Sequence, residues 1–191
     1  GKTPLHWAAQ EGKLAAARFL LENKADSSAF LLEKKSTPVM YSAAFGHLDV
    51  FELLAAHTSS LRGCLVAASE QGQVRILAHY HMMQMVDRHE TAQSKFSALR
   101  SAVYFGEADA VELLVDQMKV PIRAPVPSEP VLLVAIARGH ARIAGFLLRR
   151  LSRESLDSEL PEPPLHIAVQ CGQAAIVEHM LAEHKLDPAV L

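Results

Sequence analysis

The 191-residue sequence has few cysteines, few aromatic residues and no long apolar run. Its two cysteines, Cys64 and Cys171, are far apart, which excludes a disulfide framework or zinc-ligand spacing and favours a reducing compartment. No apolar run reaches the roughly 18 residues of a membrane-spanning helix, and no signal peptide is evident. The formal charge of −2 argues against nucleic acid or an anionic membrane as partner. The remaining composition, half apolar and 21% charged, is typical of a folded helical protein.

One phrase occurs twice, as TPLHWAAQEG at residues 3–12 and as PPLHIAVQCG at residues 163–172. The glycine that ends the phrase can be followed through the whole chain at successive spacings of 34, 26, 34, 33 and 33 residues. A short apolar helix containing small residues is expected before each glycine, and a second helix after it. The matching glycines are Gly12, Gly46, Gly72, Gly106, Gly139 and Gly172.

Each part of this repeat has a physical role. Threonine can cap a helix and proline fits its first turn, as at Thr3-Pro4 and Thr37-Pro38. The glycine allows a left-handed turn, and the small residues allow helices to approach closely. One helix pair cannot bury its apolar face alone, whereas stacked pairs can. The sequence therefore predicts an all-α helix-turn-helix solenoid with hairpin-like loops.

The period of 33 to 34 residues and the Thr-Pro-Leu-His motif resemble the ankyrin repeat. The motif is most specific at 3–6 and 164–166, and good from 37 to 47. The resemblance implies one ankyrin array over 1–191, in units of about 1–34, 35–60, 61–94, 95–127, 128–160 and 161–191. It also implies that His6 and His166 form hydrogen bonds between neighbouring units. The other units have Met40, Val66, Arg100 and Leu133 at the histidine position, so we expect less regular middle units.

The spacing of 26 residues between Gly46 and Gly72 is shorter than the others. We expect the loop between the second and third units to lack its hairpin finger, with helices ending near Ala56 and starting near Leu61. No glycine or proline interrupts 73–93, which predicts a long helix reaching His89. Proline-rich segments at 119–130 and 158–164 predict stiff loops where other fingers would lie. Because the chain starts with glycine and within a repeat, we expect it to be part of a larger protein.

No group of residues has the spacing of a catalytic or cofactor site, so we expect no enzyme activity, no metal and no cofactor. His79 and His81 would lie on different helix faces, and Cys171 has no evident acid to orient a base at His166. Met82, Met83 and Met85 either fill the core or form an adaptable contact patch. The arginines of the fifth unit, at 138, 142, 149, 150 and 153, are either balanced by acids at 154–162 or bind an acidic partner or phosphate.

The residues before each closing glycine are the candidate binding site. The resemblance implies that they face a concave groove and vary with the partner. Five of the chain's eleven aromatic residues fall at such positions or just after the motif histidine, and aromatic residues and arginine are common binding anchors. The alternative is that some pack inside the stack, Trp7 and Tyr41 above all. The candidate residues are Trp7, Glu11, Tyr41, Phe45, Gln71, Tyr104, Phe105 and Arg138.

These features predict an intracellular, most simply cytoplasmic and monomeric, protein-interaction module that binds a partner protein or peptide. The second hypothesis is a substrate-recruiting or anchoring arm of a larger protein, such as an enzyme or a bacterial effector acting in a host cell. A self-contained enzyme is the third, and it lacks a candidate site.

Overall fold

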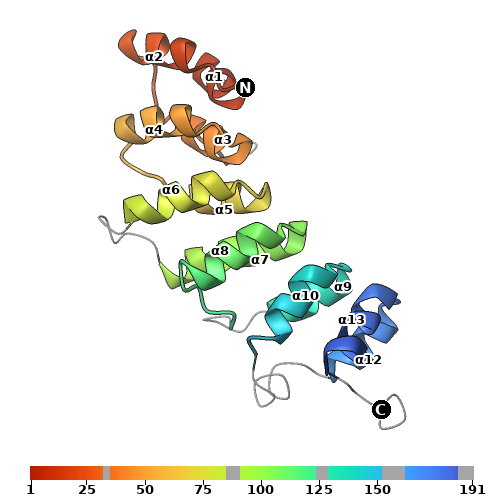
Figure 1. Cartoon of the computed structure of the whole chain (residues 1–191). Coiled ribbons are helices and arrows are strands. Elements are labelled where there is room, and N and C mark those ends of the chain that lie inside the picture. Colours follow the sequence, from red (N-terminus) through yellow and green to blue (C-terminus); the bar gives the residue numbers. More distant parts are fainter. Residues whose placement is uncertain (32–34, 85–90, 124–128, 152–161, 185–191) are drawn as a thin grey trace.

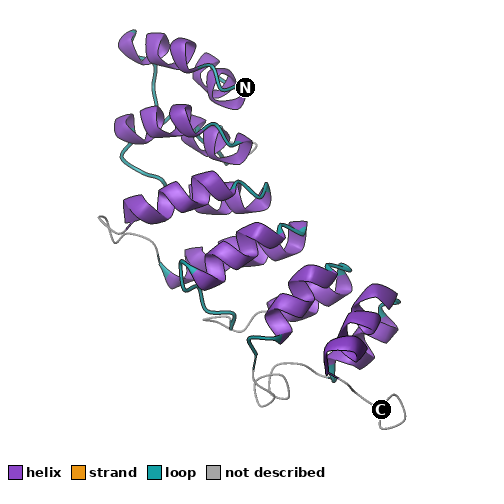
Figure 2. Cartoon of the chain, viewed as in Figure 1, coloured by secondary structure: helices purple, strands orange, loops and turns teal. Residues whose placement is uncertain are grey.

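The structure is a computed structural model that describes residues 1–31, 35–84, 91–123, 129–151 and 162–184. Within these residues the chain is helical, without a strand (Figure 2). The helices follow one another as pairs: α1 (Pro4–Gln10) and α2 (Leu14–Glu22), α3 (Pro38–Phe45) and α4 (Leu48–His57), α5 (Cys64–Glu70) and α6 (Val74–Gln84), α7 (Ala92–Phe105) and α8 (Ala108–Asp116), α9 (Val131–Ala137) and α10 (Ala141–Leu148), and α12 (Pro164–Gln170) and α13 (Ala174–His184).

The pairs stack into a curved array with the two chain ends at opposite ends of the stack (Figure 1). The first helices of the pairs, here called inner helices, pack on one another in the order α1, α3, α5, α7, α9 and α12. The second helices, here called outer helices, pack in the order α2, α4, α6, α8, α10 and α13. The inner helices and their turns lie toward the inside of the curve. This confirms the predicted all-α solenoid.

Small residues near the ends of the inner helices let neighbouring pairs approach closely. Alanine or serine at these positions is fully buried in almost every pair, as at Ala9, Ala43, Ala68, Ala102 and Ala168. The buried serines are satisfied within their own helices: the Ser42 hydroxyl donates to the Val39 carbonyl at 2.8 Å, and the Ser69 hydroxyl to the Leu65 carbonyl at 2.7 Å. Larger side chains such as Phe51, Leu54 and Leu114 fill the space between the rows.

The glycine after each inner helix has a left-handed backbone, with φ between 61° and 85°. In five of these turns, a side chain from the following helix pair occupies the space where a Cβ atom on the glycine would lie. Each of these side chains belongs to the residue directly after the turn glycine of its own pair; they are His47, Gln73, Glu107, His140 and Gln173. Three of them also bond the carbonyl two residues before the glycine: His47 Nε2 to Gln10 at 2.9 Å, His140 Nε2 to Tyr104 at 3.3 Å, and Gln173 Nε2 to Ala137 at 3.4 Å. We call this series the turn ladder. It fixes each pair on the one before.

The caps of the inner helices are partly as predicted. Thr3 and Thr37 are the N-cap residues, and Pro4 and Pro38 begin their helices. The hydroxyl of Thr37 makes no capping hydrogen bond, however. Thr91 is a capping residue that our sequence analysis missed: its hydroxyl accepts from the Ser94 N–H at 3.1 Å.

Two expectations about helix length are wrong. The third inner helix starts at Cys64 instead of near Leu61, because Gly63 has a left-handed φ of 84° and cannot continue a helix. The inner helix before Gly106 is α7, with 14 residues, instead of a short helix, since Thr91 supplies an early cap. The extension of α6 to His89 lies outside the described residues.

The loops differ in the way that the repeat spacing predicts. Between the first two pairs, Leu31 and Ser36 form an antiparallel bridge, with Leu31 N–H donating to the Ser36 carbonyl at 2.8 Å. Between α4 and α5 the chain runs only from Thr58 to Gly63 and contains no such bridge. The expected missing finger is therefore confirmed. Residues 124–128 of the first proline-rich loop and 158–161 of the second lie outside the described residues.

Replacement of Gly106 by alanine tests the turn ladder. The new Cβ would require a left-handed alanine and would lie 2.7 Å from Cε1 of His140. We expect a loss of about 1 to 3 kcal/mol in the free energy of unfolding, measured by urea denaturation. Gly172→Ala is the matched control, because its φ is also left-handed while nothing lies within 4 Å of the added Cβ. Equal losses in the two variants would contradict a role for His140 packing.

Candidate functional site

Six of the eight candidate binding residues lie at the ends of the inner helices, and Trp7 and Tyr41 lie within α1 and α3. Phe45 and Phe105 are the last residues of α3 and α7, and Glu11, Gln71 and Arg138 are the C-cap residues of α1, α5 and α9. All five are exposed. Because each precedes the closing glycine of its own turn, they share one register in the stack. We use the name concave surface for these five residues together with Trp7, Tyr41 and Tyr104.

The first cluster on this surface contains Lys2, Trp7, Tyr41 and Phe45. The Lys2 Nζ atom lies 4.5 Å from the centre of the Trp7 ring and 4.7 Å from that of Tyr41. The rings of Tyr41 and Phe45 are parallel, with centres 6.3 Å apart. Tyr41 is only 7% exposed, whereas Trp7 and Phe45 are about half exposed, at 52% and 50%. The Lys2 ammonium group thus lies near both the Trp7 and the Tyr41 rings, and the buried Tyr41 ring is parallel to the exposed Phe45 ring.

The second cluster contains Tyr104, Phe105 and Arg138. The guanidinium carbon of Arg138 lies 3.3 Å from the centre of the Tyr104 ring, an arrangement in which cation–π attraction and stacking both operate. The ring of Phe105 meets that of Tyr104 edge to face, with centres 5.2 Å apart. Both aromatic side chains remain about half exposed, at 45% and 50%. The cluster therefore offers an apolar surface with a fixed positive charge beside it.

A polar strip separates the two clusters. Glu70, at the end of α5, accepts a hydrogen bond from the Ser101 hydroxyl at 3.4 Å, and its neighbour Gln71 is exposed. At the other side of the first cluster, the Gln10 amide donates to the Glu11 carboxylate at 3.1 Å and also bonds Lys2. Trp7 additionally lines an open hollow of about 720 Å³ at the first helix pair, with Pro4, Phe19 and Leu20. Its exposure thus belongs partly to that end of the stack.

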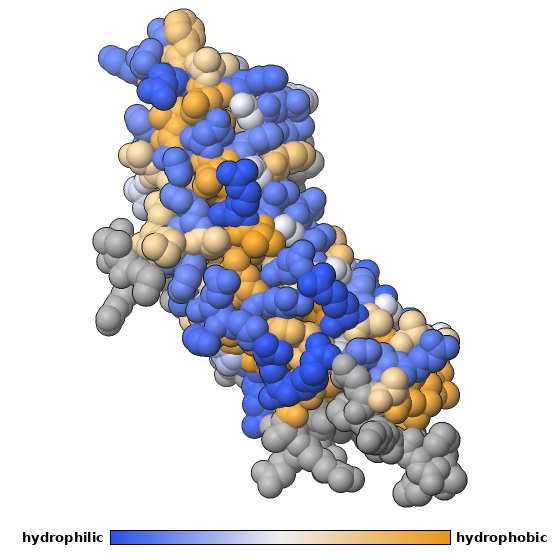
Figure 3. Space-filling view, in the orientation of Figure 1, coloured by the Kyte–Doolittle hydropathy of each residue, from blue (hydrophilic) through white to orange (hydrophobic). Residues whose placement is uncertain are grey.

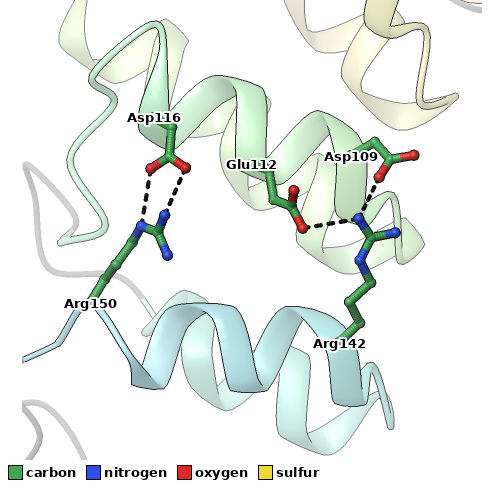
Figure 4. Close-up of polar contacts among 5 residues, drawn as sticks. All are labelled: Asp109, Glu112, Asp116, Arg142 and Arg150. Atoms are coloured by element: carbon green, nitrogen blue, oxygen red, sulfur yellow. Dashed lines mark hydrogen bonds and ion pairs between the residues drawn. The ribbon is translucent and has the colours of Figure 1, made fainter.

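The arginines on the outer helices have a different environment (Figure 4). Arg142 binds Asp109 at 2.6 Å and Glu112 at 3.0 Å, which raises the pKa of its guanidinium. Arg150 makes two parallel bonds to Asp116, at 3.0 and 2.7 Å. These acids come from α8 in the preceding pair, and hydrophilic side chains dominate this part of the face in Figure 3. The expectation that 154–162 would balance these arginines is therefore wrong for these two; most of that segment lies outside the described residues.

The other candidates from the sequence are placed as follows. Cys171 is exposed at the end of α12 and Cys64 is buried. His79 lies 3.4 Å from Glu52, and in the described part of the chain no three metal-ligating side chains come together. Met82 is 65% exposed and Met83 is partly buried against the core, while Met85 is outside the described residues.

Comparison with known proteins gives the same family from sequence and from fold. The family model "Ankyrin repeats (3 copies)" matches residues 1–63. The ankyrin repeat and KH domain-containing protein mask-1 of Caenorhabditis elegans is 27% identical over 155 residues, covering 78% of this chain. This chain spans 6% of the length of that relative. The crystal structure of the human ASB11 ankyrin repeat domain has the same fold, with a TM-score of 0.75, 20% identity, and coverage of 97% of this chain and 85% of the other.

Residues 1–63 therefore match the ankyrin repeat family, and the array as a whole has the ankyrin repeat fold. Ankyrin repeats are in general protein-interaction modules without catalytic activity, and they bind protein partners. In the described residues, no helix is long and apolar enough to cross a membrane.

The ankyrin motif histidine has its implied structural role at His6. Its Nδ1 accepts from the Thr3 N–H at 3.3 Å and bonds the Thr3 hydroxyl at 2.8 Å, while Nε2 lies 3.4 Å from the Ser36 carbonyl of the following loop. This pattern requires a neutral ring with its proton on Nε2. The ring is buried, and this burial lowers the pKa of His6 below 6.5, with the Lys2 charge acting in the same direction. His166 is exposed at the corresponding position, so the same role is not seen there.

The lowered pKa of His6 gives a testable pH dependence. In the unfolded chain His6 takes up a proton as the pH falls through about 6.5, whereas the folded site resists protonation. Its contribution to stability is therefore present above pH 6.5 and is lost as the pH falls toward the lower folded pKa. We expect the unfolding free energy of the wild type to fall more steeply between pH 7.5 and 5 than that of His6→Ala. Parallel profiles would contradict this, and His166→Ala controls for removing an exposed histidine.

Proposed function

We propose that this ankyrin array, acting as one domain over residues 1–191, binds a partner protein or peptide through its concave surface and the adjoining loops. The observation that carries the proposal is the placement of Trp7, Phe45, Tyr104 and Phe105. Phe45, Tyr104 and Phe105 lie at the ends of α3 and α7, and Trp7 lies within α1. All four are about half exposed, although the stack buries aromatic rings elsewhere, such as Phe51 and Tyr80. Exposed apolar patches on folded proteins often mark partner sites.

Two physical arguments support this surface as the binding site. Aromatic side chains and arginine carry most of the binding energy in many interfaces, because they bury a large area with few rotatable bonds. In addition, the side chains are fixed on helices that the turn ladder holds in register. A partner would therefore order little of this protein on binding, which favours affinity.

A second candidate function is that of a recruiting or anchoring arm within a longer protein. It is favoured by the C. elegans relative, a KH domain-containing protein of which this chain spans only 6%. In that case the concave surface would still bind the partner, and the chemistry or the membrane attachment would belong to other parts of the protein.

The setting we propose is inside the cell, in the cytoplasm, as a monomer. The support is chemical: Cys171 is an exposed free thiol, as suits a reducing compartment.

Substitution of two concave phenylalanines tests the proposed function. We expect Phe45→Glu combined with Phe105→Glu to reduce capture of partner proteins at least about tenfold, because carboxylates would replace two apolar anchors. Capture would be measured by affinity purification from cell lysate and quantitative mass spectrometry, with circular dichroism to verify the helical fold.

The matched control is Phe19→Glu, which introduces the same charge at a 64% exposed phenylalanine of outer helix α2. A protein lost with the double variant and retained by the control is a partner of the concave surface. If the double variant and the Phe19→Glu control both capture the same set of partner proteins as the wild type, the concave surface is not the binding site.

A further inference from the structure

We propose that the partner segment is an extended peptide with two aromatic or large apolar residues about six residues apart, each next to an acidic residue. This inference rests on the proposed function and adds the chemistry of the ligand. It follows from the charges beside the two aromatic clusters, from the polar strip between them and from the spacing of the inner helices.

Each aromatic cluster has one cation beside it, Lys2 in the first and Arg138 in the second. Lys2 lies on Trp7 and Tyr41 and bonds the Gln10 amide, and Arg138 lies on Tyr104. Among the described residues, no ion pair within 4 Å joins either cation to an acid. The contrast is sharp within the fifth pair, because Arg142 and Arg150 of α10 are both paired with acids of α8.

These two cations are held in place by aromatic faces. A guanidinium stacked on a ring keeps its outward N–H groups available for a carboxylate, and bidentate binding of a carboxylate suits that fork. In each cluster the cation lies beside an exposed aromatic ring. A ligand that binds both the cation and the ring therefore needs an acidic group next to an apolar one. At the second cluster the apolar contact is Phe105, and at the first it is Phe45 together with Trp7.

The distance between the clusters sets the spacing in the ligand. Phe45 and Phe105 occupy the same register on α3 and α7, and α5 packs between these helices. Packed helices lie about 8–10 Å apart, so two intervals separate the phenylalanines by roughly 16–20 Å. An extended chain advances about 3.3 Å per residue, so five or six residues cover this distance. The middle of the ligand would face Glu70 and Gln71, which favours a polar or basic residue there.

A synthetic peptide tests this chemistry directly. The probe is acetyl-DWGSKSGWD-amide with a fluorescent label, in which the two tryptophans are six residues apart. Binding to the wild-type chain is measured by fluorescence anisotropy at low and moderate salt. We expect the probe to bind at least about tenfold more tightly than RWGSKSGWR, and more tightly than DWSWD, which brings the tryptophans closer together. We also expect added salt to weaken binding, because the ion pairs are exposed.

Variants of the protein show which cation acts. Arg138→Gln should weaken binding of the acidic probe about five- to tenfold while changing the affinity of NWGSKSGWN, which lacks the two aspartates, much less. Lys2→Gln should act in the same direction. Arg142→Gln is the matched control, since it removes an arginine of the same helix pair that is already neutralised by Asp109 and Glu112.

The proposal is overturned if the probe does not bind, if the charge-reversed peptide binds equally well, or if Arg138→Gln affects both peptides alike. Such a result leaves the proposed function standing when Phe45→Glu plus Phe105→Glu still abolishes partner capture. When that double variant also captures the wild-type set of proteins, the proposed function fails together with the ligand chemistry.

Discussion

The structure depends on one arrangement that recurs along the chain: a left-handed glycine turn covered by a side chain from the following helix pair. At Gly106 the ring of His140 occupies the space of a Cβ and its Nε2 bonds the carbonyl of Tyr104. A bulkier residue at the glycine would separate the pairs, and the small buried residues beside it would then lose their contacts. Helix pairing, close stacking and the common register of the exposed helix ends all follow from this turn. Glu107, which packs against Gly72, differs from the histidines and glutamines of the turn ladder because a carboxylate cannot donate a hydrogen bond to a carbonyl. At this turn the long helix α7 supplies further packing against α5.

The arginines of the outer side of the array and the cations beside the concave surface differ in their charged partners. On the outer helices, arginines of one pair meet acids of the pair before, so positive charge is neutralised within the protein. In the two aromatic clusters, Lys2 and Arg138 lie on aromatic rings, and no ion pair joins either of them to an acid among the described residues. Exposed ion pairs add little stability because water screens them, but they remove charge that would attract ligands nonspecifically. The net charge of the protein is thus nearly balanced, and the ligand chemistry that we propose depends on Lys2 and Arg138.

The sequence predicted those features that repeat with a fixed offset. The glycine register gave the helix pairs, the left-handed turns, the missing finger and the row of helix ends that carries Phe45, Tyr104 and Phe105. Contacts between side chains of different helix pairs could not be predicted from the sequence, because they depend on side-chain rotamers as well as on the repeat register. Two such contacts are the position of the Lys2 ammonium over the Tyr41 ring and the ion pair of Arg150 with Asp116. The early start of α7 was within reach, because threonine is a preferred N-cap residue and Thr91 directly precedes the helix. The start of α5 was predicted too early because Gly63 was not considered as the residue directly before the helix.

The turn ladder uses its acceptor residues only through their backbone. Gln10, Tyr104 and Ala137 each offer a carbonyl oxygen to the next pair, and their three side chains have nothing in common. Mutation at these positions can therefore change what the surface recognises without altering the bond that holds the stack. In a combinatorial library, randomising these sites would sample new specificities on an unchanged scaffold. Evolution has the same freedom: one stack can acquire a new partner by point substitutions, with no selection needed to restore its fold.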